Sequence, residues 1–357
     1  MSGPSGPLLL PAPRLLDPVG VPPLRWGVVG TGIGAQVVAS VHAHSAQRFV
    51  AWTARDAVRT EAVARAHGVE RCHRDLDALL ADAGVDAVHI ATPHPLHREQ
   101  ALAAIAAGKH VMVEKPIAMS AADADEITSA ARAAGVLAME AMWTRYLPQV
   151  DVLRQVLADG LIGDPHLVRA DFGTVVPYDA TSRLWDADLG GGALLDVGIY
   201  PVSLASMALG APTSVVATGT VTPSGVDATA HLLLTHAGDA AAVLSTSLVT
   251  SLPTTAEVGG SAGRAALTAP FFAPTGLTVT VGGWDDERVG TFTHPPAAGP
   301  TDGYAFQATA FAHYVAEGRV ESPLHDHAET VSVLATLDDV RRQLVAAGRP
   351  ARVGAGG

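Results

Sequence analysis

The sequence predicts an α/β domain built on a parallel sheet, followed by an α+β domain with a large, open-faced, mostly antiparallel sheet. Its 357 residues are 48% hydrophobic, and because single domains commonly hold roughly 150 residues, two compact units are expected. Short apolar runs alternate with helical segments up to about residue 142, whereas β-branched segments dominate the rest. We therefore divide the chain into an extension (1–23), a first domain (24–143) and a second domain (144–357).

The extension carries no early positive charge, and prolines interrupt its leucines. We therefore expect a flexible segment rather than a signal peptide. No other stretch approaches the roughly 20 uninterrupted apolar residues of a membrane helix. The sequence accordingly predicts no membrane partner.

Charge and cysteine content narrow the class of protein further. Lysine and arginine number 23 against 35 acidic residues, which gives a formal net charge of -12. This balance lacks the basic excess that neutralises phosphates, so we expect no nucleic-acid partner. The lone cysteine, Cys72, cannot form an internal disulfide or a thiolate metal cluster, and it fits a reducing cytoplasm.

Short, largely apolar runs in the first domain have the character of parallel strands covered on both faces. They are the segments 24–29, 49–54, 87–92, 110–114 and 136–142. Helical segments lie between them, and one of these opens with Ser120 and Asp123 in the spacing of a capping box and closes on Gly135. This alternation predicts a Rossmann-like domain.

The second domain begins with one helical segment, 148–160, and then becomes rich in β-branched residues. The expected strands are 166–176, 213–222, 228–236, 241–250 and 277–283, and a last helix is expected at 328–344. Several of these strands alternate polar and apolar residues, which predicts an antiparallel sheet with one buried face and one free face. Because an uncovered apolar face is an association surface, we expect a homodimer through this sheet.

A glycine-rich turn, GTGIGA (30–35), follows the first strand and opens a helix. Glycines permit a tight turn and let the backbone approach a pyrophosphate, which then lies on amides at the helix N-terminus. The turn therefore predicts a dinucleotide site that involves Gly30, Gly32, Ile33 and Gly34. The alternative is a tight turn with a structural role alone.

The end of the second strand bears on the choice between NAD and NADP. An NAD site usually has an acid there, which binds the ribose 2′-hydroxyl. Here Arg55 and Asp56 follow the strand, and Arg59 lies one helical turn after Arg55. Two guanidiniums on one face suit a 2′-phosphate, so we favour NADP. In the alternative, Asp56 binds the ribose of NAD and the arginines only form a solvated helix start.

Lysine is nearly absent from this chain. Only Lys109 and Lys115 are lysines among the 23 basic residues, and an amine responds to its surroundings in ways that a guanidinium cannot. The triplet Glu114-Lys115-Pro116 ends a predicted strand, where open α/β sheets bind ligands, so the Lys115 ammonium is expected beside the nicotinamide. The alternatives are compositional drift toward arginine and a surface ion pair at a strand end.

Five motifs in order, GTGIGA, ATPHPLH, EKP, MEAMWTRYLP and GGGALLDVGIYP, together identify a resemblance that runs from about residue 24 to 345. The chain resembles the Gfo/Idh/MocA oxidoreductases, and within them the branch of the dimeric dihydrodiol dehydrogenases and glucose-fructose oxidoreductases. The resemblance implies an NAD(P)-dependent enzyme that transfers hydride between nicotinamide and a hydroxyl or carbonyl carbon. It also implies a small polyol, sugar or cyclic diol as substrate.

The resemblance places the family's catalytic lysine on Lys115 and its Asp-x-Gly-x-His/Tyr element on Asp196 to Tyr200. Residues 196 and 200 lie one helical turn apart, so their carboxylate and phenol can face one pocket. Hydride transfer leaves charge on an oxygen that a proton donor must meet, and an ammonium lowers the pKa of a phenol from its ordinary ~10. We assign Tyr200 as acid/base, Lys115 as its electrostatic partner, and Asp196 as the group that holds one of them or the substrate hydroxyl.

Further roles follow from the resemblance alone. Residues implied in cofactor binding are Thr92, Pro93, His94, His97, Glu114, Lys115, Arg183 and Trp185. Residues implied in the substrate pocket are Trp143, Arg145, Tyr146, Asp196 and Tyr200. The family usually has a cis bond before the proline of EKP, so we expect a cis Lys115–Pro116 peptide.

Some of these positions have alternatives. His94 and His97 resemble an HxxH metal pair, but no acidic or thiol ligand accompanies them, so no metal is expected. Trp143 and Trp185 equally suit core positions, because large aromatic residues usually pack. Two other functions also remain open, a sugar-sugar oxidoreductase that keeps NADP bound and a non-catalytic NADP-binding regulator.

Overall fold

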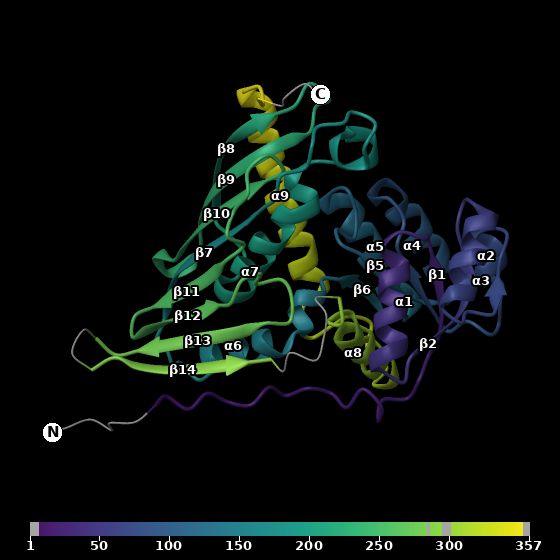
Figure 1. Cartoon of the computed structure of the whole chain (residues 1–357), viewed down its shortest axis with the longest axis horizontal. Coiled ribbons are helices and arrows are strands. Elements are labelled where there is room, and N and C mark those ends of the chain that lie inside the picture. The colour runs from purple at the N-terminus through teal and green to yellow at the C-terminus, as the bar shows by residue number, and fades with distance from the viewer. Residues whose placement is uncertain (1–6, 284–285, 295–300, 353–357) are drawn as a thin grey trace. The chain divides into compact units, whose positions relative to one another are not determined.

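The computed structural model describes residues 7–283, 286–294 and 301–352, and the chain divides into two compact units (Figure 1). The parallel-sheet unit comprises residues 15–146 and 298–334. The antiparallel-sheet unit comprises residues 1–14, 147–297 and 335–357. Each unit is therefore assembled from segments that are distant in the sequence.

The parallel-sheet unit contains a six-stranded sheet in the order β3-β2-β1-β4-β5-β6, with every pair of neighbours parallel. Its strands are β1 (Arg25–Val29), β2 (Arg48–Thr53), β3 (Arg71–Cys72), β4 (Ala87–Ile90), β5 (His110–Glu114) and β6 (Ala138–Ala141). This is the strand order of a doubly wound Rossmann sheet. The prediction missed only β3, because two residues are too few to give a pattern.

Helices connect these strands. They are α1 (Ile33–His44), α2 (Ala57–Ala66), α3 (Leu76–Leu80), α4 (His97–Ala106) and α5 (Ala121–Ala134). Four of them are in the predicted places, whereas the short α3 was not predicted. The predicted ends of α5 are confirmed: the Ser120 hydroxyl accepts a hydrogen bond from the Asp123 amide, and Gly135 ends the helix at φ 67°.

The same unit includes α8 (Tyr304–Ala316), which the prediction did not contain. The ring centroid of Phe311 lies 4.6 Å from that of Trp26 on β1. Most of α8 is buried, so its sequence is apolar on all sides and lacks the amphipathic pattern by which helices are recognised.

The antiparallel-sheet unit contains an eight-stranded sheet in the order β14-β13-β12-β11-β7-β10-β9-β8. Its strands are β7 (Pro165–Gly173), β8 (Ser214–Val221), β9 (Asp227–Thr235), β10 (Ala241–Ser247), β11 (Ala256–Gly260), β12 (Gly263–Leu267), β13 (Gly276–Val281) and β14 (Arg288–Thr293). Among these eight strands, β7 and β10 pair in parallel and the other neighbours pair antiparallel. The two architectures together confirm the predicted fold class.

One face of this sheet is covered by helices. α6 (Pro148–Ala158) packs on β13 and β14, and α7 (Ile199–Leu209) packs on β7 and β10. In α9 (His327–Ala347), Gln343 donates a hydrogen bond to the Val215 carbonyl of β8 and accepts one from the Ala217 amide. On the opposite face, Val216, Leu233 and Val243 stand in register on β8, β9 and β10 and are exposed.

The N-terminal segment is not free in the part that the structure describes. The Leu8 amide donates to the Val289 carbonyl of β14, and the Arg14 amide donates to Asp151 of α6. Leu8 is itself buried. The predicted flexible extension is therefore wrong for residues 7–14, because Leu8 buries apolar surface and the Leu8 and Arg14 amides are hydrogen-bonded to β14 and α6. Residues 1–6 lie outside the described residues.

The run Ala187–Leu209 is long and apolar enough, by length and composition, to cross a membrane. Asp188 and Asp196 interrupt it, and 78% of its apolar window is buried inside the protein. The core helix of a soluble protein passes the same test, so this run is weak evidence for a membrane span.

Candidate functional site

The glycine-rich turn lies where the sequence predicts it, between β1 and α1. Gly30 has a φ of 105°, and a side chain there would collide with the Ala91 carbonyl, so glycine is required. Gly32 caps α1, and a Cβ added to it would meet open space. The first turn of α1 has no side-chain cap and no acidic residue. Unobstructed amides at a helix N-terminus suit the pyrophosphate of a dinucleotide.

The residues that bear on cofactor choice begin α2. The Asp56 carboxylate is the N-cap of this helix and accepts a hydrogen bond of 3.0 Å from the Arg59 amide. Arg55 and Arg59 are exposed, and among the described residues neither guanidinium has an ion pair. One carboxylate oxygen of Asp56 thus caps the helix, and the exposed guanidiniums of Arg55 and Arg59 lie on either side of it in the sequence.

His97 joins the loop after β4 to the turn after β5. It is fully buried, its Nδ1 lies 2.8 Å from the Pro116 carbonyl oxygen, and its Nε2 lies 2.9 Å from the Thr92 carbonyl oxygen. Burial lowers the pKa of His97, although the two carbonyl oxygens oppose this shift. His94 is also buried, with its ring centroid 5.6 Å from that of His97. These histidines therefore form part of the packing between two loops.

The turn after β5 carries the predicted lysine. The Lys115–Pro116 peptide bond is cis, as predicted. Glu114 precedes it and is buried, with Oε1 3.2 Å from Nε2 of the fully buried His89. This pair is within ion-pair distance, but the geometry leaves both atoms without a hydrogen bond to any described residue. An unsatisfied buried carboxylate oxygen fits the predicted contact of Glu114 with a cofactor.

The other lysine has a structural task that the sequence did not reveal. Lys109 Nζ donates hydrogen bonds of 3.0 Å and 2.8 Å to the carbonyl oxygens of Asp82 and Val85. Two backbone carbonyls in reach of one ammonium explain why an amine stands here.

The segment after β6 is engaged inside the parallel-sheet unit. Trp143, Arg145 and Tyr146 are all buried. The Arg145 guanidinium binds Glu329, with Nη2–Oε1 at 2.6 Å and Nη1–Oε2 at 3.2 Å. The Tyr146 hydroxyl donates to Ser322 Oγ at 2.7 Å. Their predicted contact with substrate stays a prediction, and their packing roles are additional to it.

In the antiparallel-sheet unit, Asp196 and Tyr200 come from consecutive turns of one helical run. Asp196 lies on a π-helical turn, Leu194–Gly198, which continues directly into α7, where Tyr200 is the second residue. Arg183 Nη2 donates to Asp196 Oδ1 at 3.1 Å. π turns within helices often accompany functional sites, and this one carries Asp196 directly before the helix that carries Tyr200.

Tyr200 packs in an aromatic group that the sequence analysis did not anticipate. Its ring centroid lies 5.6 Å from that of Phe172 and 5.8 Å from that of Phe272, and these two phenylalanines stack at 4.6 Å. The chain separation of the three residues concealed this grouping. Aromatic walls of this kind suit the apolar face of a ring-shaped ligand.

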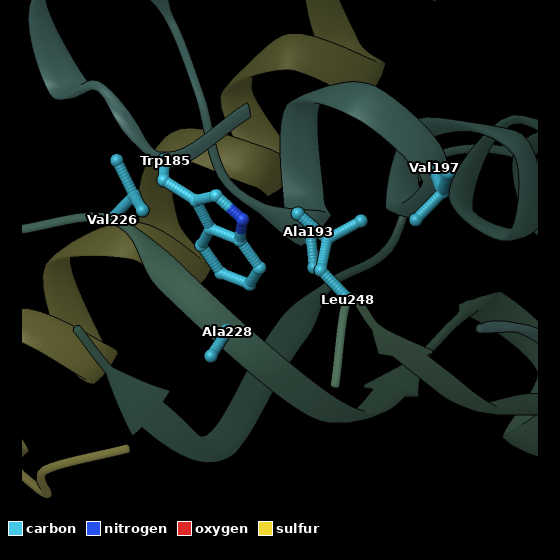
Figure 2. Packing of buried hydrophobic residues seen from close by; sticks show 6 residues of the cluster. All are labelled: Trp185, Ala193, Val197, Val226, Ala228 and Leu248. Carbon is cyan, nitrogen blue, oxygen red and sulfur yellow. The ribbon is translucent and has the colours of Figure 1, made fainter. Parts of the chain in front are cut away.

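The start of this helical run rests on a hydrophobic cluster, which Figure 2 shows. The cluster consists of Trp185, Ala193, Val197, Val226, Ala228 and Leu248. Trp185 is fully buried, and its Nε1 donates to the Pro177 carbonyl at 2.8 Å. The structure thus places Trp185 in the core, which was one of its two predicted roles, and its contact with the cofactor stays a prediction.

Asp227 was not predicted and holds the first residues of the π turn. Its Oδ2 accepts a hydrogen bond of 2.7 Å from the Leu194 amide, and a side chain at Gly192 would collide with its carboxylate. Burial raises the pKa of Asp227 to about 7, against the opposing effect of backbone amides and Arg341.

Groups of three or more His, Cys, Asp and Glu side chains able to hold a metal ion do not occur in the part of the chain that the structure describes. His94 and His97 lie close together, but acidic or thiol side chains do not complete a set of ligands around them.

Comparison with known proteins assigns both halves of the chain to one family. A model described as an oxidoreductase family with an NAD-binding Rossmann fold matches residues 24–142, and the Gfo/Idh/MocA C-terminal domain matches residues 150–266. Trans-1,2-dihydrobenzene-1,2-diol dehydrogenase of Mus musculus is 34% identical over 332 residues, which are 90% of this chain and 97% of that protein. The Homo sapiens protein of the same name is 33% identical with the same coverage.

Solved structures agree with this assignment. A 3-ketoreductase from Actinomadura kijaniata, in complex with NADP and TDP-benzene, superposes with a TM-score of 0.79 at 28% identity, over 90% of this chain and 98% of that one. Levoglucosan dehydrogenase in complex with NADH and levoglucosan gives a TM-score of 0.83 at 21% identity, over 91% and 98% of the two chains, and shows the shared fold. The fold, the nucleotide-binding turn and these matches together show that the chain belongs to the Gfo/Idh/MocA family of NAD(P)-binding oxidoreductases.

Proposed function

We propose that this oxidoreductase prefers NADP and moves hydride between the nicotinamide and a hydroxyl-bearing carbon of a cyclic diol or a sugar. The observation that carries the proposal is the likeness to dihydrodiol dehydrogenases over 97% of their length. The 3-ketoreductase solved with NADP supports this nucleotide and a carbonyl as one partner in the reaction. The sugar ring is the alternative substrate that the shared motifs imply. The aromatic group of Phe172, Tyr200 and Phe272 suits either kind of ring.

Three side chains divide the chemistry in this proposal. When bound, the nicotinamide accepts the hydride, with its two electrons, from the substrate carbon, or returns it in the reverse direction. The Tyr200 oxygen takes the hydroxyl proton of the substrate, so that an alcohol becomes a carbonyl and one proton is released. The Lys115 ammonium stabilises the charged form of the tyrosine, and Asp196, braced by Arg183 at 3.1 Å, orients the substrate hydroxyl.

The preference for NADP rests on Arg55 and Arg59. Both guanidiniums are exposed at the start of α2, and one oxygen of Asp56 between them caps this helix. A 2′-phosphate accepts hydrogen bonds from guanidinium groups, whereas a ribose hydroxyl gains less from them. Double replacement, Arg55→Ala with Arg59→Ala, is expected to raise KM for NADP by about tenfold or more and to leave KM for NAD nearly unchanged.

The test is a screen for reduction of NADP and NAD with trans-1,2-dihydrobenzene-1,2-diol, levoglucosan, aldoses and inositols. We expect turnover with a cyclic diol or sugar, and loss of about 100-fold or more in kcat for Lys115→Ala and Tyr200→Phe. Lys109→Ala is the matched control, because Lys109 binds backbone carbonyls away from the turn. Full activity of both site variants contradicts the assigned roles.

The same screen separates the alternatives. A sugar-sugar oxidoreductase would purify with NADP bound and show ping-pong kinetics without net release of NADPH. A non-catalytic NADP-binding regulator would bind the nucleotide and turn over none of the substrates. The presence of both Lys115 and Tyr200 favours the enzyme.

We further propose that the chain forms a homodimer through its open sheet face. Support comes from the exposed row of Val216, Leu233 and Val243 on three adjacent strands. Light scattering is expected to give twice the 36.5 kDa mass of one chain, and Leu233→Lys is expected to shift the protein toward the monomer. A monomer in both cases contradicts the proposal.

A further inference from the structure

The peptide group between Pro116 and Ile117 has a polar side-chain partner at its carbonyl oxygen and another at its N–H. Its carbonyl oxygen lies 2.8 Å from Nδ1 of His97, and its N–H donates a hydrogen bond of 2.8 Å to Oε1 of Glu140. Pro116 alone separates Lys115 from this peptide group, so the two contacts hold the backbone one residue beyond the lysine. Ile117, Glu140 and His97 are all buried, and hydrogen bonds are stronger in such a low-dielectric surrounding than in water.

Glu140 is the first member of a chain of buried charges that extends away from the turn. Its Oε2 lies 2.9 Å from Nε2 of His325, and Nδ1 of His325 lies 3.3 Å from Oε2 of Glu329. Glu329 in turn binds Arg145 through both carboxylate oxygens. The side chains of Glu140, His325 and Arg145 are each at most 2% exposed, and that of Glu329 is 23% exposed.

The geometry favours the charged form of His325. Its Nε2 and Nδ1 face carboxyl oxygens at 2.9 Å and 3.3 Å, and an imidazolium donates hydrogen bonds from both nitrogens. Burial and Arg145 lower the pKa of His325, but the hydrogen bonds to Glu140 and Glu329 outweigh them and the net shift is upward. The four side chains then alternate in sign and sum to zero charge, which is how a low-dielectric interior tolerates them.

We propose that Glu140 and His325 are positioning residues for Lys115, acting through the Pro116–Ile117 peptide and anchored by Glu329 and Arg145. The proposal rests on the proposed function, since it gives Lys115 its catalytic purpose. The buried Ile117 amide needs an acceptor, which one neutral oxygen would supply. Stability alone does not explain the further charges behind Glu140, because an apolar core of equal volume packs at least as stably. The network ends at the Ile117 amide, close to Lys115 in the chain. Its charges therefore hold the stretch of backbone that carries the lysine.

The scarcity of lysine makes this proposal measurable without a substrate. Reductive methylation with ¹³C-formaldehyde labels Lys109, Lys115 and the terminal amine, so the NMR spectrum contains few signals and their midpoints can be followed with pH. Lys109→Arg assigns the spectrum. Lys109 also serves as an internal reference, because its contacts are the carbonyls of Asp82 and Val85 and none belongs to the network.

Glu140→Gln keeps the shape of the side chain and an oxygen for the Ile117 amide, but it removes the charge that holds His325. We expect the Lys115 signal to move and its titration midpoint to shift by about 0.5 pH units or more, with Lys109 unchanged. Glu321→Gln is the matched control. Glu321 lies four residues before His325 and accepts a hydrogen bond of 2.9 Å from the His327 amide, but 41% of its side chain is exposed. An unchanged Lys115 signal, or equal changes at both lysines, overturns the proposal.

Kinetics supply a second readout through a double-mutant cycle with Lys115→Ala. Glu140→Gln alone is expected to lower kcat by about 10- to 100-fold, with little change in KM for the nucleotide. In the Lys115→Ala background the same substitution is expected to change the residual rate less than about twofold, since the group it positions is gone. Equal losses in both backgrounds overturn the proposal.

The two possible failures are distinguishable. If Lys115→Ala retains full turnover, the proposed function fails, and the NMR comparison still decides whether Glu140 positions the lysine. If Glu140→Gln does not fold, Glu329→Gln takes its place, because Glu329 is partly exposed and one step further from the turn. The expected result is then a smaller Lys115 shift in the same direction, and a Lys115 signal identical to wild type overturns the proposal.

Discussion

Each unit buries a carboxylate against the backbone of a segment that carries a proposed catalytic side chain, but the two carboxylates are compensated differently. In the parallel-sheet unit, Glu140 accepts from the Ile117 amide and faces the His325 imidazolium. In the antiparallel-sheet unit, Asp227 accepts from the Leu194 amide just before the turn that carries Asp196. The first carboxylate therefore has a charged partner, His325, whereas the second is hydrogen-bonded to a backbone amide.

The difference shows in how the groups titrate. Glu329, the outer acid of the charged network, has its pKa lowered to about 2, because hydrogen bonds and the charges of His325 and Arg145 outweigh the effect of burial. Asp227 has its pKa raised to about 7, because burial outweighs its amide partners. Backbone amides and Arg341 therefore do not keep the buried Asp227 fully charged at neutral pH, whereas His325 and Arg145 keep the partly exposed Glu329 charged.

The largest expected effect comes from breaking the network at its centre. His325→Leu leaves Glu140 and Glu329 charged and facing an apolar side chain. We expect the free energy of unfolding at pH 7 to fall by about 3–5 kcal/mol, measured by urea denaturation. The control is His44→Leu, an exposed histidine that pairs with Asp302 at 3.2 Å, for which we expect a loss below about 1 kcal/mol. Equal losses for both variants would break the comparison.

A smaller effect, with a distinctive pH dependence, is expected at Asp227. A carboxyl whose pKa is raised in the folded state binds its proton more tightly than in the unfolded chain, so stability falls as pH rises from about 4 to about 7. Asp227→Asn removes this titration. The free energy of unfolding of the variant relative to wild type should therefore rise between pH 4.5 and pH 7.5, by on the order of 3 kcal/mol.

Between about pH 4.5 and pH 6, the titration of Asp227 is separated from that of Glu329 and His325 in the other region. Glu329 titrates below it, because its pKa is lowered to about 2. The raised pKa of His325 contributes stability that is fully present below about pH 6.5 and is lost as pH rises through the folded pKa. If the relative stability of Asp227→Asn stays constant across this window, the carboxylate is ionised throughout and the contrast between the two regions fails.

The features that the sequence predicted correctly are local ones. The glycine-rich turn, the Ser120 cap and the place of Lys115 at the end of β5 each depend on a few consecutive residues, whose preferences decide the backbone. The strands β11 and β12 escaped prediction because AEVGG and GRAAL contain few β-branched residues. Pairing with neighbouring strands decides their conformation, and that information is not local.

The same distinction between local and non-local signals applies to the residues of the candidate site. Asp196 and Tyr200 could be paired from their spacing on one helix. Glu140 and His325 are separated by 185 positions in the chain, so no spacing connects them. Their only sequence signals were a glutamate inside an apolar strand and a run of charged residues before the last helix. Asp227 gave the same kind of signal, an acid at the start of a strand that proved to be buried.

The smallest expected effect concerns the ion pair beside the proposed catalytic residues of the antiparallel-sheet unit. Arg183 and Asp196 contact at 3.1 Å, but 40% of the arginine side chain is exposed, against 2% for Arg145 in its pair with Glu329. Arg183→Met is therefore expected to lower the free energy of unfolding by less than about 1 kcal/mol, because water reaches the Asp196 carboxylate that loses its partner. Arg145→Met should lower it several times more, since Glu329 then remains beside His325 without its strongest partner. If urea denaturation gives the two variants equal losses, burial does not determine how much each ion pair contributes to the free energy of unfolding. The two regions then differ in packing rather than in the energetics of their charges.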